Sequence, residues 1–261
     1  MFNFNVVLEI GRGPAKGMRM KSSIRSMLLA LVASMLFAPV VMATDLEPYN
    51  PDTGVHGSLT LYGWYVFPGG DITIGDGTIG IGGGDGSIFD ILDGFFMANG
   101  ELRYGDFGVY GDVLYAGLSD DNANSGWELD ALVVTGLLTY DVMRSSSGFV
   151  QVGVGARYWE VDTGFYIGPI ERDRNPNWVD FVGGLRGQQY LSDALYIEGT
   201  ALVGFGGSDF MWDVSGGLGY NFTPNFSGSV GYRGMGVNYE AGLTELDLTF
   251  HGPVAGLTLR F

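Results

Sequence analysis

The sequence predicts an all-β fold, namely a transmembrane up-and-down antiparallel β-barrel of ten strands. The chain closes with an alternating stretch, residues 254–261, in which Leu257, Leu259 and Phe261 share one face of a strand. It contains 45 glycines and 14% aromatic residues but only 16% charged residues, a composition that is natural for a barrel in lipid. After Thr44 no apolar run is long enough for a transmembrane helix, so any membrane residence must come from strands.

The first 43 residues are predicted to be an extended N-terminus followed by a secretory signal peptide. Residues 20–25 supply a positive region, an apolar stretch covers 27–41, and 41–43 form a small-residue cleavage site. We therefore expect the mature protein to begin at Thr44.

The mature chain is strongly acidic. Removing residues 1–43 takes away five of the 13 basic residues and one of the 29 acidic residues, which leaves eight Arg, 28 acids and a net charge of −20. Such a chain is not expected to bind nucleic acid. Cysteine is absent, so neither disulfides nor thiol chemistry is available. The expected partners are outer-membrane lipids and lipopolysaccharide, together with the barrel-assembly machinery during insertion.

Residues 44–55 are predicted to be a periplasmic tail and residues 56–261 the barrel. Ten stretches within the barrel alternate with a period of two. They span 56–67, 94–104, 107–118, 127–141, 148–161, 177–190, 194–206, 210–222, 226–239 and 246–261.

Short and long connections alternate along these strands. The longest are 68–93 and 162–176, and alternation of this kind indicates periplasmic turns and external loops. Eight strands is the alternative if 56–67 or 94–104 is mispaired, and twelve becomes possible if residues 71–82 form a hairpin.

Parity separates two faces on every predicted strand. The outward residues beside the short turns would form a periplasmic aromatic girdle: Tyr104, Phe107, Tyr140, Phe222, Phe226 and Phe261. The outer girdle would contain Tyr65, Tyr115, Tyr158, Phe205 and Trp212. The apolar residues between the girdles are Val109, Val113, Leu132, Val134, Val152, Val154, Ile197, Val203, Leu218 and Val230.

The opposite face collects a set of ten charged residues, which is predicted to form a charge network in the lumen. A soluble barrel would show the reverse polarity, with apolar residues inside, so this sorting favours a membrane barrel. The ten are Glu101, Arg103, Asp112, Arg157, Asp180, Arg186, Glu198, Asp213, Arg233 and Arg260. We expect Arg157, Arg186 and Arg233 to pair with Asp112, Asp180 and Asp213 across the lumen.

The C-terminus resembles the signal by which bacterial outer-membrane barrels are recognised for insertion, here carried by Gly256, Leu259 and Phe261. The second half of the chain resembles a family of uncharacterised proteobacterial outer-membrane β-barrel proteins. The resemblance lies in a W-x-D-x-x-x-G-x-R strand, a G-S-D-F segment and a G-Y-R strand, and it covers about residues 177–261. The matching residues are Trp178, Asp180, Gly184 and Arg186, then 207–210, then 231–233. Leu202 stands where that family would carry an acid. The resemblance implies location and fold but brings no reaction, substrate or catalytic residue.

Motifs for catalysis or cofactors are scarce, and we predict no catalysis, no cofactor and no metal. The acidic segment 85–93 favours a short helical turn capped by Ser87 over a calcium loop. His251 shares parity with Asp247, and such a pair could serve an outer-membrane hydrolase, but a structural role beside the Gly252–Pro253 interruption is favoured.

The sequence therefore predicts a small outer-membrane barrel with a structural or surface-contact role, and a narrow passive pore for small solutes is the alternative. Small barrels tend to be filled by side chains. Ten lumen charges together with Trp64, Trp159 and Trp178 would obstruct much of the bore.

Overall fold

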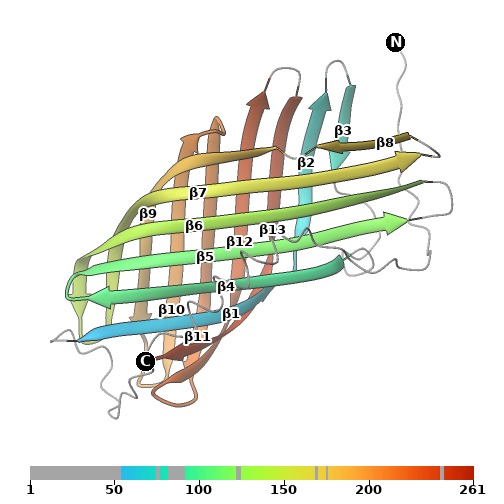
Figure 1. Ribbon diagram of the computed structural model, residues 1–261. Coiled ribbons are helices and arrows are strands. Elements are labelled where there is room, and N and C mark those ends of the chain that lie inside the picture. The colour runs from blue at the N-terminus through green and yellow to red at the C-terminus, as the bar shows by residue number, and fades with distance from the viewer. Residues whose placement is uncertain are drawn as a thin grey trace.

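The computed structural model describes residues 54–74, 77–81, 92–121, 125–167, 170–174, 176–241 and 244–261 (Figure 1). Among them, no helix is long and apolar enough to cross a membrane. The strands are β1 (Val55–Trp64), β2 (Phe67–Ile74), β3 (Gly77–Ile81), β4 (Leu92–Tyr104), β5 (Phe107–Asp121), β6 (Ser125–Ser145), β7 (Gly148–Ile167), β8 (Ile170–Arg174), β9 (Asn177–Tyr190), β10 (Leu195–Gly206), β11 (Phe210–Asn221), β12 (Phe226–Ala241) and β13 (Thr244–Arg260).

Ten of these strands form a closed antiparallel barrel in the order β1-β4-β5-β6-β7-β9-β10-β11-β12-β13, and pairing of β1 with β13 closes the ring. At the closure Ser58 lies opposite Arg260, and Leu61 lies opposite Leu257. The ring gives every barrel strand a partner on both sides, as a barrel in lipid requires. The prediction of a ten-stranded barrel is confirmed.

The first predicted strand, 56–67, is wrong at its end. β1 stops at Trp64, and after two irregular residues β2 continues along the upper part of β13. The break faces Gly252 and Pro253, where the Tyr65 N–H donates to the Pro253 carbonyl at 2.9 Å. A Cβ on Gly252 would lie 1.8 Å from the Tyr65 carbonyl oxygen, so only glycine fits this interruption. Tyr65 consequently belongs to the irregular link and not to a girdle position in a strand.

The hairpin on which the twelve-strand alternative depended does form, as β2 and β3, with Ile72 opposite Ile79. It does not raise the barrel count, because β2 extends the β1 side of the wall and β3 pairs with β2 alone among the described strands.

The expected long loop at 162–176 is also wrong. β7 continues to Ile167 and pairs with β8, in a register that places Ile167 opposite Ile170. β6 and β7 reach 21 and 20 residues, because each supplies the other with a partner beyond the barrel rim. The predicted signal peptide, most of the predicted tail, and the predicted turn at Ser87 lie outside the described residues.

One end of the barrel, here called the turn end, carries the short connections 105–106, 146–147, 191–194 and 222–225. The start of β1 and the end of β13 lie at this end, and the opposite end is called the loop end (Figure 1). At the turn end the predicted aromatic girdle is present, since its tyrosines and phenylalanines are exposed on the outer wall. They include Tyr104, Phe107, Tyr140, Phe222 and Phe226.

The outer apolar surface has a defined upper limit. Tyr115 donates to Asp130 at 2.8 Å, and Tyr158 donates to Glu160 at 3.0 Å. Acidic side chains thus lie in contact with the outer tyrosines, and the apolar surface ends at this level. Phe107 and Tyr115 are separated by eight residues, or about 27 Å along the strand. At a barrel tilt of roughly 40° this corresponds to a band about 20 Å tall, close to the height of a lipid-facing band. Val113, Tyr115 and Leu132 within it form a buried cluster against Phe96, Val134 and Tyr158.

Candidate functional site in the barrel lumen

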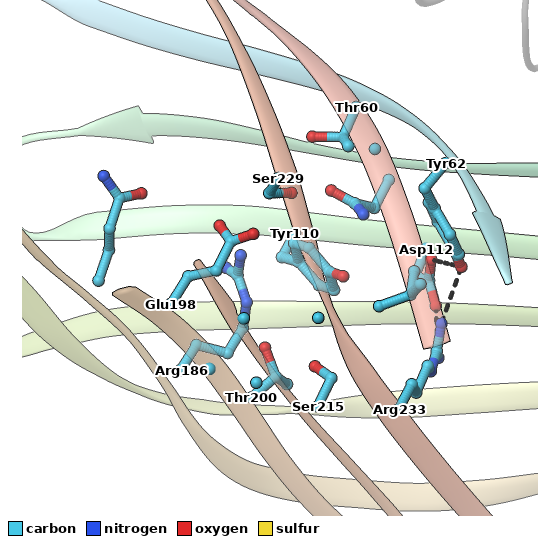
Figure 2. A pocket seen from close by; sticks show the side chains of 18 of the residues that line it. Thr60, Tyr62, Tyr110, Asp112, Arg186, Glu198, Thr200, Ser215, Ser229 and Arg233 are labelled. Carbon is cyan, nitrogen blue, oxygen red and sulfur yellow. Dashed lines mark hydrogen bonds and ion pairs between the residues drawn. The ribbon is translucent and has the colours of Figure 1, made fainter. Parts of the chain in front are cut away.

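The lumen is built in three levels. Nearest the loop end lies an apolar layer, defined as Trp64, Met97, Leu114, Trp159, Trp178, Met211, Met235 and Val237. Below it lies a charge layer, defined as Tyr62, Asp112, Arg157, Asp213 and Arg233. Between the charge layer and the turn end lies a polar cavity, seen from close by in Figure 2.

The apolar layer is densely packed, because all its side chains are buried. Trp178 stacks between two aromatic rings, with ring centroids 4.5 Å from Tyr239 and 5.6 Å from Trp159. Leu202, which occupies the position where the resembling family carries an acid, is buried in the same cluster. These inward apolar residues are an exception to the polar lumen that parity predicted.

The charge layer forms a continuous network of short contacts. Asp213 accepts from Arg157 Nη2 at 2.6 Å and from Arg233 Nε at 3.0 Å. Arg233 also donates from Nη2 to Asp112 at 2.9 Å and from Nη1 to the Tyr62 hydroxyl at 2.8 Å. The Tyr62 hydroxyl in turn donates to Asp112 at 2.7 Å.

The network spans the bore, because its five residues come from β1, β5, β7, β11 and β12 on different sides of the wall. All five side chains are buried, and Arg157 is 0% exposed. A charged pair at this depth is tolerated only when its hydrogen bonds are satisfied, and here they are.

Asp180 does not pair with an arginine, in contrast to the prediction. Its carboxylate accepts from Trp159 Nε1 at 3.0 Å and from the Ser208 backbone N–H at 2.7 Å. Arg157 lies opposite Asp180 in the β7–β9 register but turns across the lumen to Asp213. Asp180 therefore holds the 207–209 loop over the lumen. The hydrogen bond from Ser208 to Asp180 brings the G-S-D segment of the sequence into contact with the W-x-D segment.

Arg186 pairs with Glu101, Nη1 to Oε2 at 3.3 Å, and not with an aspartate. Its guanidinium lies over the Tyr110 ring at 3.7 Å, and Gln151 bridges by accepting from Arg186 and donating to Glu101. Arg103 lies nearer the turn end and contacts Asp141.

Sequence reasoning missed two members of this group, Asp141 and Gln151, although both are buried and inward-facing. Asp141 stood at the last position of a predicted strand with the parity of inward Thr139, so the signal was present. Arg144 completes the group with an ion pair to Asp141 at 2.6 Å.

The polar cavity has a volume of about 170 Å³. One wall, on β1 and β10 to β13, consists of hydroxyl residues, and Glu101, Tyr110 and Arg186 of β4, β5 and β9 lie on the other. Tyr110 and Arg186 are seen in Figure 2. The hydroxyl wall comprises Ser58, Thr60, Thr200, Ser215, Ser229 and Thr258. Glu198 lines the cavity as an exposed side chain, and Arg260 donates to Asn221 at 3.0 Å beside it. Of the ten predicted charges, Glu198 and Arg260 are thus the ones outside the buried groups.

His251 lies on the outer wall and is exposed. Its Nδ1 contacts the Tyr232 hydroxyl at 2.6 Å, and its ring lies 5.7 Å from that of Phe67. Asp247 is four residues away on the regular part of β13, about 13 Å along the strand, so the two side chains do not form a hydrogen-bonded pair. In the described part of the chain no cluster of three His, Asp or Glu residues is placed to hold a metal ion.

No protein-family model matches the sequence, and no curated protein matches it. Among solved structures, the outer membrane protease OmpT from Escherichia coli aligns with a TM-score of 0.53 at 11% sequence identity, over 83% of this chain and 100% of that one. Ail from Yersinia pestis aligns with a TM-score of 0.39 at 13% identity, over 80% of this chain and all of Ail. The translocator domain of the autotransporter NalP from Neisseria meningitidis aligns with a TM-score of 0.39 at 14% identity, over 92% of this chain and 95% of that domain.

The chain therefore has the fold of bacterial outer-membrane β-barrels. At such low identity the likeness to OmpT extends to the barrel and not to its chemistry.

Proposed function

We propose that this protein is an integral outer-membrane barrel with a closed lumen, no catalytic activity and a structural or surface-contact role. The observation that carries the proposal is the double closure of the bore, in which a fully hydrogen-bonded charge layer lies beneath a packed apolar layer. Ion flow would require both layers to separate, and each is buried. The finer resemblance to the proteobacterial family at residues 177–261 fits this location.

The proposal places the turn end in the periplasm and the loop end outside the cell. Lipids would contact the apolar outer wall, and lipopolysaccharide would meet the acidic residues beyond Tyr115 and Tyr158. Leu259 is exposed on the outer wall, whereas the backbone of Phe261 is bonded to Gly57 at the barrel closure. A terminal strand in this position suits recognition by the assembly machinery.

Removal of Phe261 tests this part of the proposal. We expect the shortened protein to reach the periplasm but to lose most of its heat-modifiable, protease-resistant form in the membrane. Removal of Phe2 is the matched control, since residues 1–43 are expected to be cleaved. Normal accumulation of the folded barrel without Phe261 would contradict the assignment of an insertion signal.

The surface-contact role is supported by the length of the strands at the loop end. A tilted strand crosses a bilayer with about 9–11 residues, whereas β6 and β7 contain 21 and 20. About half of each strand would therefore stand outside the membrane as a rigid sheet, with Asp130 opposite Asp162 on its outer face. A rigid acidic platform of this kind suits contact with a cationic or cation-bridged surface.

The absence of catalysis is part of the proposal. OmpT is named a protease. In this chain the His251 ring nitrogen contacts a tyrosine on the outer wall and is not paired with an acid.

Single-channel recording on refolded protein separates the closed barrel from the alternative, a narrow passive pore. We expect no steady conductance from the unmutated protein in a planar bilayer, with heat-modifiable migration showing that the barrel is folded. Arg186→Ala, at the wall of the polar cavity, should remain closed as well. Arg174→Ala, on β8 beyond the barrel rim, is the matched control. Steady open channels in the unmutated protein, with Arg186→Ala altering ion selectivity, would favour the pore.

A further inference from the structure

The polar cavity contains two charged residues whose hydrogen bonds the protein completes in part (Arg186) or not at all (Glu198). Arg186 donates from Nη1 to Gln151 and contacts Glu101, but its buried Nε has no hydrogen-bond partner. Glu198 forms neither a hydrogen bond nor an ion pair with the rest of the described chain. The buried Nε is closed off from the cavity, whereas Nη2 forms no hydrogen bond within the described chain. Arg186 Nη2 and the Glu198 carboxylate are therefore the free groups of two residues that line the same space.

The two groups are close but separate. Arg186 lies opposite Thr200 in the register of β9 and β10, and Glu198 lies opposite Gln188. Arg186 and Glu198 are thus diagonal neighbours on one face, a relation in which side chains lie about 7–8 Å apart at their bases. Figure 2 shows both directed into the cavity, yet no ion pair within 4.0 Å joins them.

Hydroxyl groups complete the lining. Thr200, Ser215 and Ser229 point into the cavity from three consecutive strands (Figure 2). Their side chains are short, and inward Gly217 and Gly231 beside them add no side chain at all. The wall therefore offers donors and acceptors while leaving open volume.

The cavity is a dead end. Asp213 and Arg233 at its inner limit are buried, whereas Ser229, Thr258 and Arg260 toward the turn end are half-buried and Glu198 is exposed. The charge layer closes the side toward the loop end, so solute would have to enter from the turn end, past the buried Tyr196 and Ser227. The volume of about 170 Å³ gives room for several water molecules or for a small polar solute such as an amino acid.

We propose that the polar cavity binds a small zwitterion of α-amino-acid size, with its carboxylate at the Arg186 guanidinium and its ammonium at Glu198. A guanidinium edge recognises a carboxylate well, and a carboxylate accepts the hydrogen bonds of an ammonium group. The hydroxyl wall would bond to the remaining polar atoms. This inference goes beyond the proposed closed barrel and does not depend on whether the lumen conducts.

Binding of three probes of similar size to the refolded full-length barrel tests the proposal. The probes are L-alanine, which carries both charges, propionate, which carries only the carboxylate, and n-propylamine, which carries only the ammonium. In saturation-transfer NMR titrations we expect alanine to bind at least tenfold more tightly than either single-charge probe. A dialanine titration separates a free amino acid from the end of a peptide, and we expect dialanine to bind more weakly than alanine because of the small volume.

Two variants test which residue binds the carboxylate of the ligand and which binds its ammonium group. Glu198→Gln should weaken alanine binding at least tenfold and leave propionate binding unchanged, whereas Arg186→Gln should weaken both. Glu240→Gln on β12 and Arg174→Gln on β8, neither of which lines the cavity, are the matched controls and should bind like the unmutated protein. Because Glu198 is exposed and unpaired, its variant should fold normally even if Arg186→Gln does not.

Three results would overturn the proposal: no alanine binding, equal binding of all three charged probes, or alanine binding that Glu198→Gln leaves unchanged. Each could occur in a protein that remains closed to ions, so failure here is distinguishable from failure of the proposed function.

Discussion

The charge layer and the polar cavity are built from the same residue types, arginine and acid on inward strand positions, but they use them in opposite ways. In the charge layer Arg233 donates to Asp112, Asp213 and Tyr62, all of them buried. In the cavity Arg186 pairs with Glu101 through Nη1 but leaves Nη2 unbonded within the described chain, and Glu198 stays exposed without a partner. The difference shows that completed pairing, and not charge itself, determines whether a lumen residue closes the barrel or remains available to solute.

The largest expected effect comes from removing the shared acid of the charge layer. Asp213→Ala would leave Arg157 and Arg233 buried beside each other without the carboxylate that joins them. Loss of one partner from a buried pair costs about 3–5 kcal/mol, and urea unfolding in detergent measures it. Glu198→Ala, an acid of the cavity, is the control and should change stability by about 0.5 kcal/mol or less. Equal losses of unfolding free energy in the two variants would show that the charge layer is as accessible to water as the polar cavity.

Asp180→Ala should have the next largest effect. The carboxylate that accepts from Trp159 and from the Ser208 N–H would be lost, and two hydrogen bonds to a charged group would go with it. We expect a loss of about 1.5–3 kcal/mol and faster proteolysis at 207–209 at the loop end. Asp193→Ala in the exposed turn 191–194 is the matched control. An unchanged cleavage rate in Asp180→Ala would contradict the role of Asp180 in holding this loop.

Tyr62→Phe probes the charge layer with a smaller change. The hydroxyl donates to Asp112 and accepts from Arg233, so its removal should cost about 1–2 kcal/mol by urea unfolding. Tyr104→Phe on the exposed girdle provides the comparison and should cost close to nothing. If the two variants are equally stable, the Tyr62 hydroxyl contributes no net stability to the network.

Two serines on one face of β12 give the finest comparison. Ser227 is buried and lies 3.1 Å from the Tyr196 hydroxyl, whereas Ser229 lines the cavity. Ser227→Ala should cost about 1 kcal/mol, and Ser229→Ala about 0–0.5 kcal/mol, both by urea unfolding. A larger loss of stability for Ser229→Ala than for Ser227→Ala would show that Ser229, and not Ser227, belongs to the buried part of the lumen.

The sequence was sufficient to predict the barrel, its ten strands and the direction of its side chains. Alternation with period two shows which residues point inward, because a strand has only two faces. It therefore placed Asp112, Arg157, Asp213 and Arg233 on the inner wall without any knowledge of their partners.

The tertiary structure alone determined which of the inward residues contact one another. Arg157 lies opposite Asp180 on the neighbouring strand but bonds to Asp213 across the lumen, a contact set by the curvature of the closed sheet. Similarly, the sequence indicated an interruption at Gly252–Pro253 but not that β1 would break opposite it.

The alternation of side chains between the two faces of a strand is a local property. The sequence by itself therefore determined the fold class and which charged residues point inward. Distances across a lumen depend on the tilt, register and closure of all ten strands together, so only the tertiary structure decided which charges pair in the closed layer and which, like Glu198, remain free in the cavity.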